Sequence, residues 1–111
     1  MSRQTMLEQI SSALTSIEGL PVFHYFKPSE VKDRYCVWAE DSEATSLQAG
    51  NIKYIQQIQG TIDLFSKTEF DTAVDSIQTA LNNAQIGFYQ NSVQYEDDTG
   101  LIHWEWVFYI S

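Results

Sequence analysis

His103 and Glu105 are the side chains of this sequence whose types and spacing most readily suggest chemistry. They stand two residues apart in a segment where large apolar residues alternate with others. Such alternation is typical of a β-strand, so both side chains project from the same face. A histidine beside a carboxylate is a common pair for general acid–base catalysis. A solvated sheet face carries the same residue types, and we favour that interpretation.

Two other groups of residues could carry chemistry, and each has a simpler explanation. Cys36 and His24 could act as nucleophile and base on adjacent strands. Cys36 lies within an apolar run, however, where a thiol is usually an inert small hydrophobe. The acidic residues 96–98 lack the ligand spacing of a calcium loop, and Gly100 after them is typical of a hairpin turn. We therefore predict no catalytic, cofactor-binding or metal-binding residue, and no enzyme activity.

The composition narrows the class of protein further. A length of 111 residues predicts one domain, residues 1–111, with its own hydrophobic core. Fifteen acidic and six basic residues give a net charge of −9, which argues against a free-standing nucleic-acid binder, because phosphates require clustered Lys and Arg. One cysteine permits no intramolecular disulfide. No run approaches the roughly 18 apolar residues that span a bilayer, so we expect a soluble, cytoplasmic protein.

The C-terminal stretch, residues 85–110, predicts a hairpin on which the core is built. The acidic turn of residues 96–100 joins its two strands. The second strand places five large apolar side chains on one face, namely Ile102, Trp104, Trp106, Phe108 and Ile110. A row of this size must be covered, so the rest of the chain is expected to pack on it.

Two helices are predicted to cover this sheet. The first spans residues 3–18 and ends before Gly19, and its apolar stripe consists of Met6, Ile10, Leu14 and Ile17. The second begins with Thr68 as its N-cap. Its apolar residues recur at helical spacing, and they are Phe70, Val74, Ile77 and Leu81.

Three further strands and one loop lie between the helices. Residues 22–26 predict a short strand, and residues 35–39 a strand that is apolar on both faces and therefore covered twice, by a helix or by a neighbouring subunit. Residues 40–50 are polar early and predict an exposed loop. Residues 51–65 predict the longest strand, with a bulge or bend at Gly60.

The resulting order is α-β-β-β-α-β-β, which predicts an α+β fold: a mostly antiparallel sheet with two helices packed on it. The strand of residues 35–39 and the strand of residues 51–65 are the surfaces we nominate for subunit contact. The candidate interface residues are Tyr35, Val37, Trp38, Lys53, Ile55, Gln57, Gln59 and Phe65. The alternative is that both strands belong wholly to the internal core.

Parts of the sequence resemble a known family. The resemblance covers roughly residues 3–110 and is clearest in residues 52–65, the helix after them, and the segments Ile86-Gly87-Phe88-Tyr89 and Tyr95-Glu96-Asp97-Asp98-Thr99-Gly100-Leu101-Ile102-His103-Trp104-Glu105-Trp106. These residues are similar to the tail terminator proteins, also called tail completion or tail-to-head joining proteins. The family is encoded in tailed phages and prophages of Gram-positive bacteria.

The resemblance implies a structural role in the virion tail, with assembly in the host cytoplasm. Proteins of this family form a hexameric ring on the head-proximal end of the tail tube, stop its growth and meet the head–tail connector protein. Their long strand pair and its loop commonly contact the ring and the tail tube protein, which here would be residues 51–65 and 40–50. The resemblance implies no catalytic residue and no cofactor, and an acidic protein suits a lumen through which DNA passes.

Two other functions stay open at this point. The chain could be a head-side connector or minor capsid component. It could instead be a small ligand-binding α+β domain with a cavity under Trp104 and Trp106. A closed ring would favour the tail terminator, and a monomer with a deep polar-lined pocket would favour the ligand-binding domain.

Overall fold

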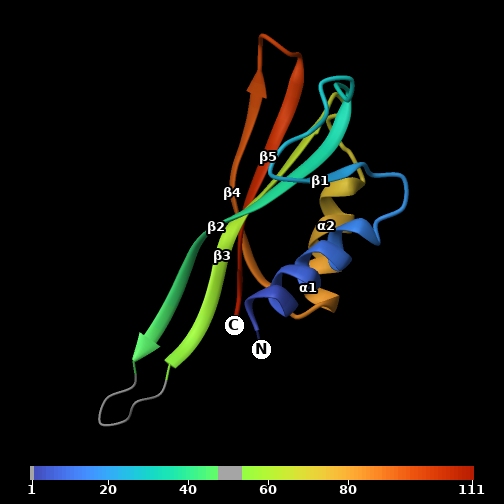
Figure 1. Ribbon diagram of the computed structural model, residues 1–111. Helices are drawn as coiled ribbons and strands as arrows, with labels where there is room; N and C mark the ends of the chain where they lie inside the picture. The colour runs from blue at the N-terminus through green and yellow to red at the C-terminus, as the bar shows by residue number, and fades with distance from the viewer. Residues whose placement is uncertain (1, 48–53) are drawn as a thin grey trace.

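The computed structural model describes the backbone of residues 2–47 and 54–111 and the side chains of residues 2–41 and 57–111. The elements follow the order α1 (Arg3–Thr15), β1 (Val22–His24), β2 (Arg34–Leu47), β3 (Tyr54–Ser66), α2 (Ala73–Asn83), β4 (Gly87–Glu96) and β5 (Leu101–Ile110), as Figure 1 shows. In these ranges the strands form one five-stranded sheet in the order β1-β2-β3-β5-β4. The β1–β2 pair is parallel, and the other pairs are antiparallel. The predicted α+β fold and its element order are confirmed.

Both described helices pack on the same side of the sheet, which we call the helix side (Figure 1). The predicted row of β5 faces them: Trp106 and Phe108 are fully buried, and Trp104 and Ile110 nearly so. The strands contribute further buried residues to this core, namely Cys36, Trp38, Ile58, Ile62 and Leu64. The opposite side of the sheet, which we call the open side, has neither α1 nor α2 on it.

The boundaries of both helices differ from the predicted ones. The first helix stops at Thr15 rather than at residue 18, and Gly19 follows with a positive φ of 77°. The second helix begins at Ala73, so the prediction of Thr68 as its N-cap is wrong. Phe70 lies before the helix and is 87% exposed, because the chain between β3 and α2 turns away from the core there. Neither helix of the described ranges is long and apolar enough to cross a membrane.

The loop predicted over residues 40–50 is wrong for its first eight residues. The second strand runs through to Leu47 and pairs with β3 as far as Leu47↔Tyr54. Residues 48–50 lie outside the described part of the chain. The first strand is also shorter than predicted and ends at His24.

The bend predicted at Gly60 occurs in the strand opposite it. The register slips between Glu40↔Gly60 and Ser42↔Gln59, so Asp41 is the extra residue and the bulge belongs to β2. A Cβ on Gly60 would collide with the Ala39 carbonyl oxygen. Glycine is therefore required at position 60 because the β2 backbone comes too close for any side chain.

Beyond the last β3–β5 pair, Ile58↔Ile110, β2 and β3 continue as a two-stranded hairpin that we call the arm. It consists of residues 44–47 and 54–57, which in the described ranges pair only with each other. In Figure 1 the arm extends away from the helices and the rest of the sheet. An isolated two-stranded hairpin is marginally stable in water, so the arm is suited to packing against another molecule.

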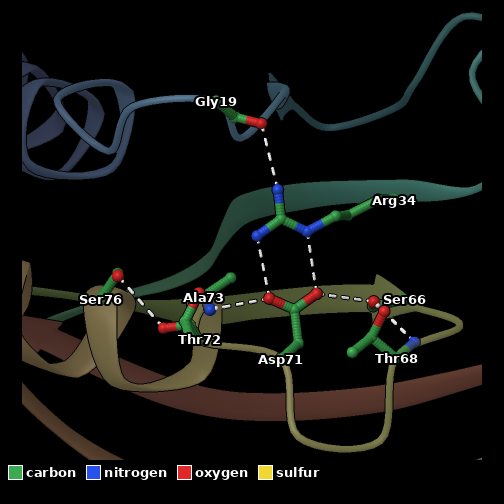
Figure 2. A network of polar contacts seen from close by, with 8 residues as sticks. All are labelled: Gly19, Arg34, Ser66, Thr68, Asp71, Thr72, Ala73 and Ser76. Atoms are coloured by element: carbon green, nitrogen blue, oxygen red, sulfur yellow. Dashed lines mark hydrogen bonds and ion pairs between the residues drawn. The ribbon is translucent and has the colours of Figure 1, made fainter.

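A polar junction fixes the start of α2 to the sheet (Figure 2). Arg34 donates two hydrogen bonds to the Asp71 carboxylate, at 2.8 and 2.9 Å, and a third to the Gly19 carbonyl at 3.1 Å. Asp71 also accepts from the Ser66 hydroxyl at 2.6 Å and from the Ala73 backbone N–H at 2.8 Å. One carboxylate thus joins β2, the end of β3 and the first turn of α2, and it caps that helix.

Candidate functional site

The open side of the sheet carries a row of rings that crosses three strands. Tyr35 pairs with Phe65, and Phe65 pairs with His103, so their side chains are neighbours on one face. The ring centroids lie 4.7 Å apart in the first pair and 4.2 Å apart in the second, and both pairs are stacked. The Lys27 ammonium lies 5.2 Å from the Tyr35 ring centroid, over the face of that ring. Tyr35 is only 7% exposed.

A cluster of a histidine and two carboxylates adjoins this row. The His103 Nε2 atom lies 2.6 Å from the Asp63 Oδ1 atom, and Asp63 stands directly opposite Glu105 in the β3–β5 register. One potential ligand atom of each of the three residues lies within 4.8 Å of those of the other two. Burial raises the pKa of Asp63, and the hydrogen bond with His103 opposes that shift. The histidine and carboxylates of this cluster are half-buried rather than fully solvated.

Residues outside this cluster orient two of its members. The Nδ1 atom of His103 lies 3.5 Å from a carboxylate oxygen of Glu96. The Asn91 side-chain amide donates a hydrogen bond of 2.7 Å to Glu105. Asn91 is able to reach across because the β4–β5 register slips at that residue. The sequence identified His103 and Glu105 as neighbours, but it did not identify Asp63, which depends on the register between distant strands.

A second polar cluster gathers around Glu40 near the β1 edge. Its carboxylate is hydrogen-bonded to His24 at 2.7 Å, to the Tyr25 hydroxyl at 2.5 Å and to Arg3 at 3.0 Å. Burial acts to raise the pKa of Glu40, but the hydrogen bonds from Tyr25 and His24 outweigh it and hold the pKa below its ordinary value. The His24 ring also stacks on Trp38, with centroids 3.8 Å apart. These contacts tie the start of α1 and the β1 strand to β2.

The structure does not bring Cys36 and His24 together as a nucleophile and base. In the parallel β1–β2 register Cys36 is the partner of Val22, whereas His24 is the partner of Trp38. The Cys36 thiol is fully buried, and burial raises its pKa to about 12. A thiol in that environment is protonated and inaccessible at neutral pH, so it is a packing residue.

The eight predicted interface residues do not form one surface. Trp38 lies on the helix side and is 3% exposed, so it offers a neighbour almost no surface. Lys53 lies outside the described residues, and so does the side chain of Ile55. The remaining five residues alternate along β2 and β3 with the core residues, so they lie on the open side of the sheet. Tyr35 is covered there, and the residues that a neighbouring subunit could reach are Val37, Gln57, Gln59 and Phe65.

The cavity proposed under Trp104 and Trp106 is filled by the core. Trp106 is fully buried, and its indole N–H donates to the Gln78 side chain at 3.0 Å. A hollow of about 270 Å³ lies beside Trp104 instead, lined otherwise by residues 69–72, 74 and 75 at the start of α2. Its wall is largely the exposed Phe70 segment, so it is a surface depression over the helix start.

Comparison with known proteins identifies the architecture but no family. The sequence matches no protein-family model and no curated protein. The fold is similar to that of a chain in a solved structure described as the virion of a native gene transfer agent (GTA) particle. The TM-score is 0.56 at 12% sequence identity, and the match covers 93% of this chain and 87% of that chain. At this identity the likeness establishes a shared fold.

Proposed function

We propose that this chain is a structural protein of a phage or prophage virion, and that it acts there as a tail terminator. In this role it forms a ring, hexameric as in the family that the sequence resembles, which caps the tail tube and joins it to the head. Its partners are copies of itself, the tail tube protein and the head–tail connector protein. The observation that carries the proposal is the fold likeness to a chain of the GTA virion, a phage-like particle.

The sheet has the open edges that ring assembly requires. In the described strands β4 pairs only with β5, so one row of its backbone N–H and C=O groups faces outward. The ten residues of β4 contain neither lysine nor proline, two residues that often protect such an edge, and its bulge at Asn91 interrupts only part of it. The opposite edge is open too, because β1 has three residues and β2 has fourteen. Two different open edges on one chain favour head-to-tail contacts, which form a ring when the rotation between successive copies closes.

The arm and the charge agree with a position at the end of a tube. The arm supplies a surface that the described chain itself does not cover, which suits contact with the next ring of the tube or with a neighbouring subunit. The net charge of −9 disfavours tight contact with DNA passing through the ring. We therefore expect neither sequence-specific DNA binding nor membrane binding.

The first experiment measures the native mass of the purified protein over a range of concentrations, with negative-stain images of the largest species. We expect a closed ring of six copies. The variant Val93→Lys places a charge on the exposed β4 edge and should weaken the ring. Thr79→Lys adds the same charge on the exposed face of α2 and should leave it intact. A chain that stays monomeric at every concentration would contradict self-assembly in solution.

A second experiment separates the tail terminator from the head-side connector. Particles are produced from the encoding phage or prophage without this chain and viewed by electron microscopy. Loss of a terminator should give tails of irregular, excessive length without heads. Tails of normal length detached from heads would instead support the connector on the head side. Intact virions would overturn both roles.

A further inference from the structure

We propose that Asp63, His103 and Glu105 form a binding site for a first-row divalent cation, with Zn²⁺ as the ion that fits best. The three side chains come from β3 and β5, two adjacent strands that each have neighbours on both sides in the described sheet. Such strands hold their side chains more rigidly than loops do, so the cluster is preorganised.

The donor set selects the ion. One imidazole nitrogen and two carboxylate oxygens are ligands that Zn²⁺ accepts at about 2.0 to 2.2 Å. An imidazole ligand disfavours Ca²⁺ and Mg²⁺, which prefer oxygen alone. Ligands of a tetrahedral zinc ion lie about 3.4 Å apart, as follows from those bond lengths. The three ligand atoms already lie within 4.8 Å of one another. Side-chain rotations that move these atoms by about an ångström would bring them to the spacing of a zinc site.

The surroundings of His103 are those of a metal-binding histidine. Its Nε2 atom lies 2.6 Å from Asp63, while its Nδ1 atom lies 3.5 Å from Glu96. Histidine ligands in proteins usually present their second nitrogen to a carboxylate, which fixes the ring and strengthens it as a ligand. Glu105 is held from outside by Asn91 in the same way. We assign Glu96 and Asn91 as positioning residues of the site.

The charge of the site also favours a dication. Asp63 and Glu105 place two carboxylates around one point, and Glu96 adds a third carboxylate behind the histidine. A cation relieves the repulsion among these groups, and the acidic protein attracts cations to its surface. The three protein ligands leave a fourth position for water or for a side chain of a partner, as in open zinc sites.

The test is isothermal titration of the purified protein with Zn²⁺, repeated with Ca²⁺. We expect one Zn²⁺ per chain and at least tenfold weaker Ca²⁺ binding. His103→Ala should abolish Zn²⁺ binding, the isosteric variants Asp63→Asn and Glu105→Gln should weaken it at least tenfold, and Glu96→Gln about tenfold. The control is His24→Ala, which removes the other histidine of the chain. It should bind Zn²⁺ like the wild type.

Co²⁺ provides a readout that does not depend on heats of binding. The Co²⁺ complex should show ligand-field absorption bands that disappear in His103→Ala and persist in His24→Ala, with circular dichroism confirming that both variants are folded. Absence of Zn²⁺ binding, unchanged binding by His103→Ala, or loss of binding in His24→Ala would each overturn the proposal. Since the ligands come from one chain, the result is independent of whether a ring forms.

Discussion

Asp71→Ala should lower the free energy of unfolding by about 3 kcal/mol. The two bonds from Arg34 are hydrogen bonds to a charged group, worth about 1.5 to 3 kcal/mol. The bond to the Ala73 N–H caps α2 and adds about 1 kcal/mol. The Arg34 side chain is 37% exposed, so water partly replaces the lost carboxylate and keeps the total below the sum of the parts.

The same carboxylate makes stability depend on pH in a defined direction. Hydrogen bonds from Arg34, opposed by burial, and then from Ser66 and Ala73 hold the pKa of Asp71 well below its ordinary value. Its stabilisation is therefore complete above the unfolded pKa of about 3.9 and is lost as the pH falls toward the folded pKa. Between pH 6 and pH 3 the Asp71 carboxyl should lower the free energy of unfolding of the wild type by about 1.3 kcal/mol. Asp71→Asn has no carboxyl at this position, so it should not show this loss.

Urea unfolding followed by the fluorescence of the three tryptophans measures both effects. For 111 residues, 3 kcal/mol also corresponds to a fall in Tm of about 13 °C. The matched control is Asp33→Ala, which removes an exposed carboxylate paired with Lys67 at 3.0 Å and should cost less than about 0.5 kcal/mol. The reasoning is refuted if Asp71→Ala behaves like this control, or if the gap between wild type and Asp71→Asn stays constant from pH 6 to pH 3.

Three further predictions concern the core. Gly60→Ala should lower the free energy of unfolding in urea by about 3 kcal/mol, because its Cβ meets the β2 backbone. Gly87→Ala should lower it by only about 1 kcal/mol, because its Cβ meets the Tyr109 ring, which can move. Equal losses in the two variants would contradict the close approach of β2 to Gly60. Trp106→Ala should lower the free energy of unfolding by about 3 to 5 kcal/mol, because Trp106 is fully buried in the core. Glu105→Ala without added metal should lower it by less than about 0.5 kcal/mol. If thermal melts showed the larger loss for Glu105→Ala, the assignment of Trp106 to the buried face of β5 would be wrong. Cys36 should resist thiol reagents at pH 8 until the protein unfolds, since burial raises its pKa to about 12; rapid labelling of folded protein would disprove this.

The sequence predicted those parts of the fold that a single element encodes. Alternation in β5 fixed the facing of Trp104, Trp106 and Phe108, and all three lie in the core. The start of α2 was missed because Phe70 continues the helical spacing by chance and the capping carboxylate, Asp71, acts through Arg34, which is 37 residues away. Local periodicity does not contain such a distant partner.

The strand between residues 40 and 47 and the Asp63 cluster were missed for the same kind of reason. A run of polar residues looks like a loop, and pairing with β3 is what makes it a strand. His103 and Glu105 share a strand, so their proximity was predictable. Asp63 joins them through the β3–β5 register, which brings together residues 40 and 42 positions apart. A register between distant strands is set by the whole core.

The inner position of β5 has a consequence for the order in which the protein can fold. In the described sheet β5 lies between β3 and β4, yet it follows both of them in the sequence and is synthesised after them. Until it emerges, β3 and β4 have no shared neighbour, and the helices have no Trp106 or Phe108 to cover. Folding of this sheet during synthesis must therefore wait for residues 101–110, and the nascent chain exposes strand edges and apolar surface in the meantime. We expect a chain that lacks β5 to aggregate, because it would leave the edges of β3 and β4 and the apolar faces of the helices uncovered.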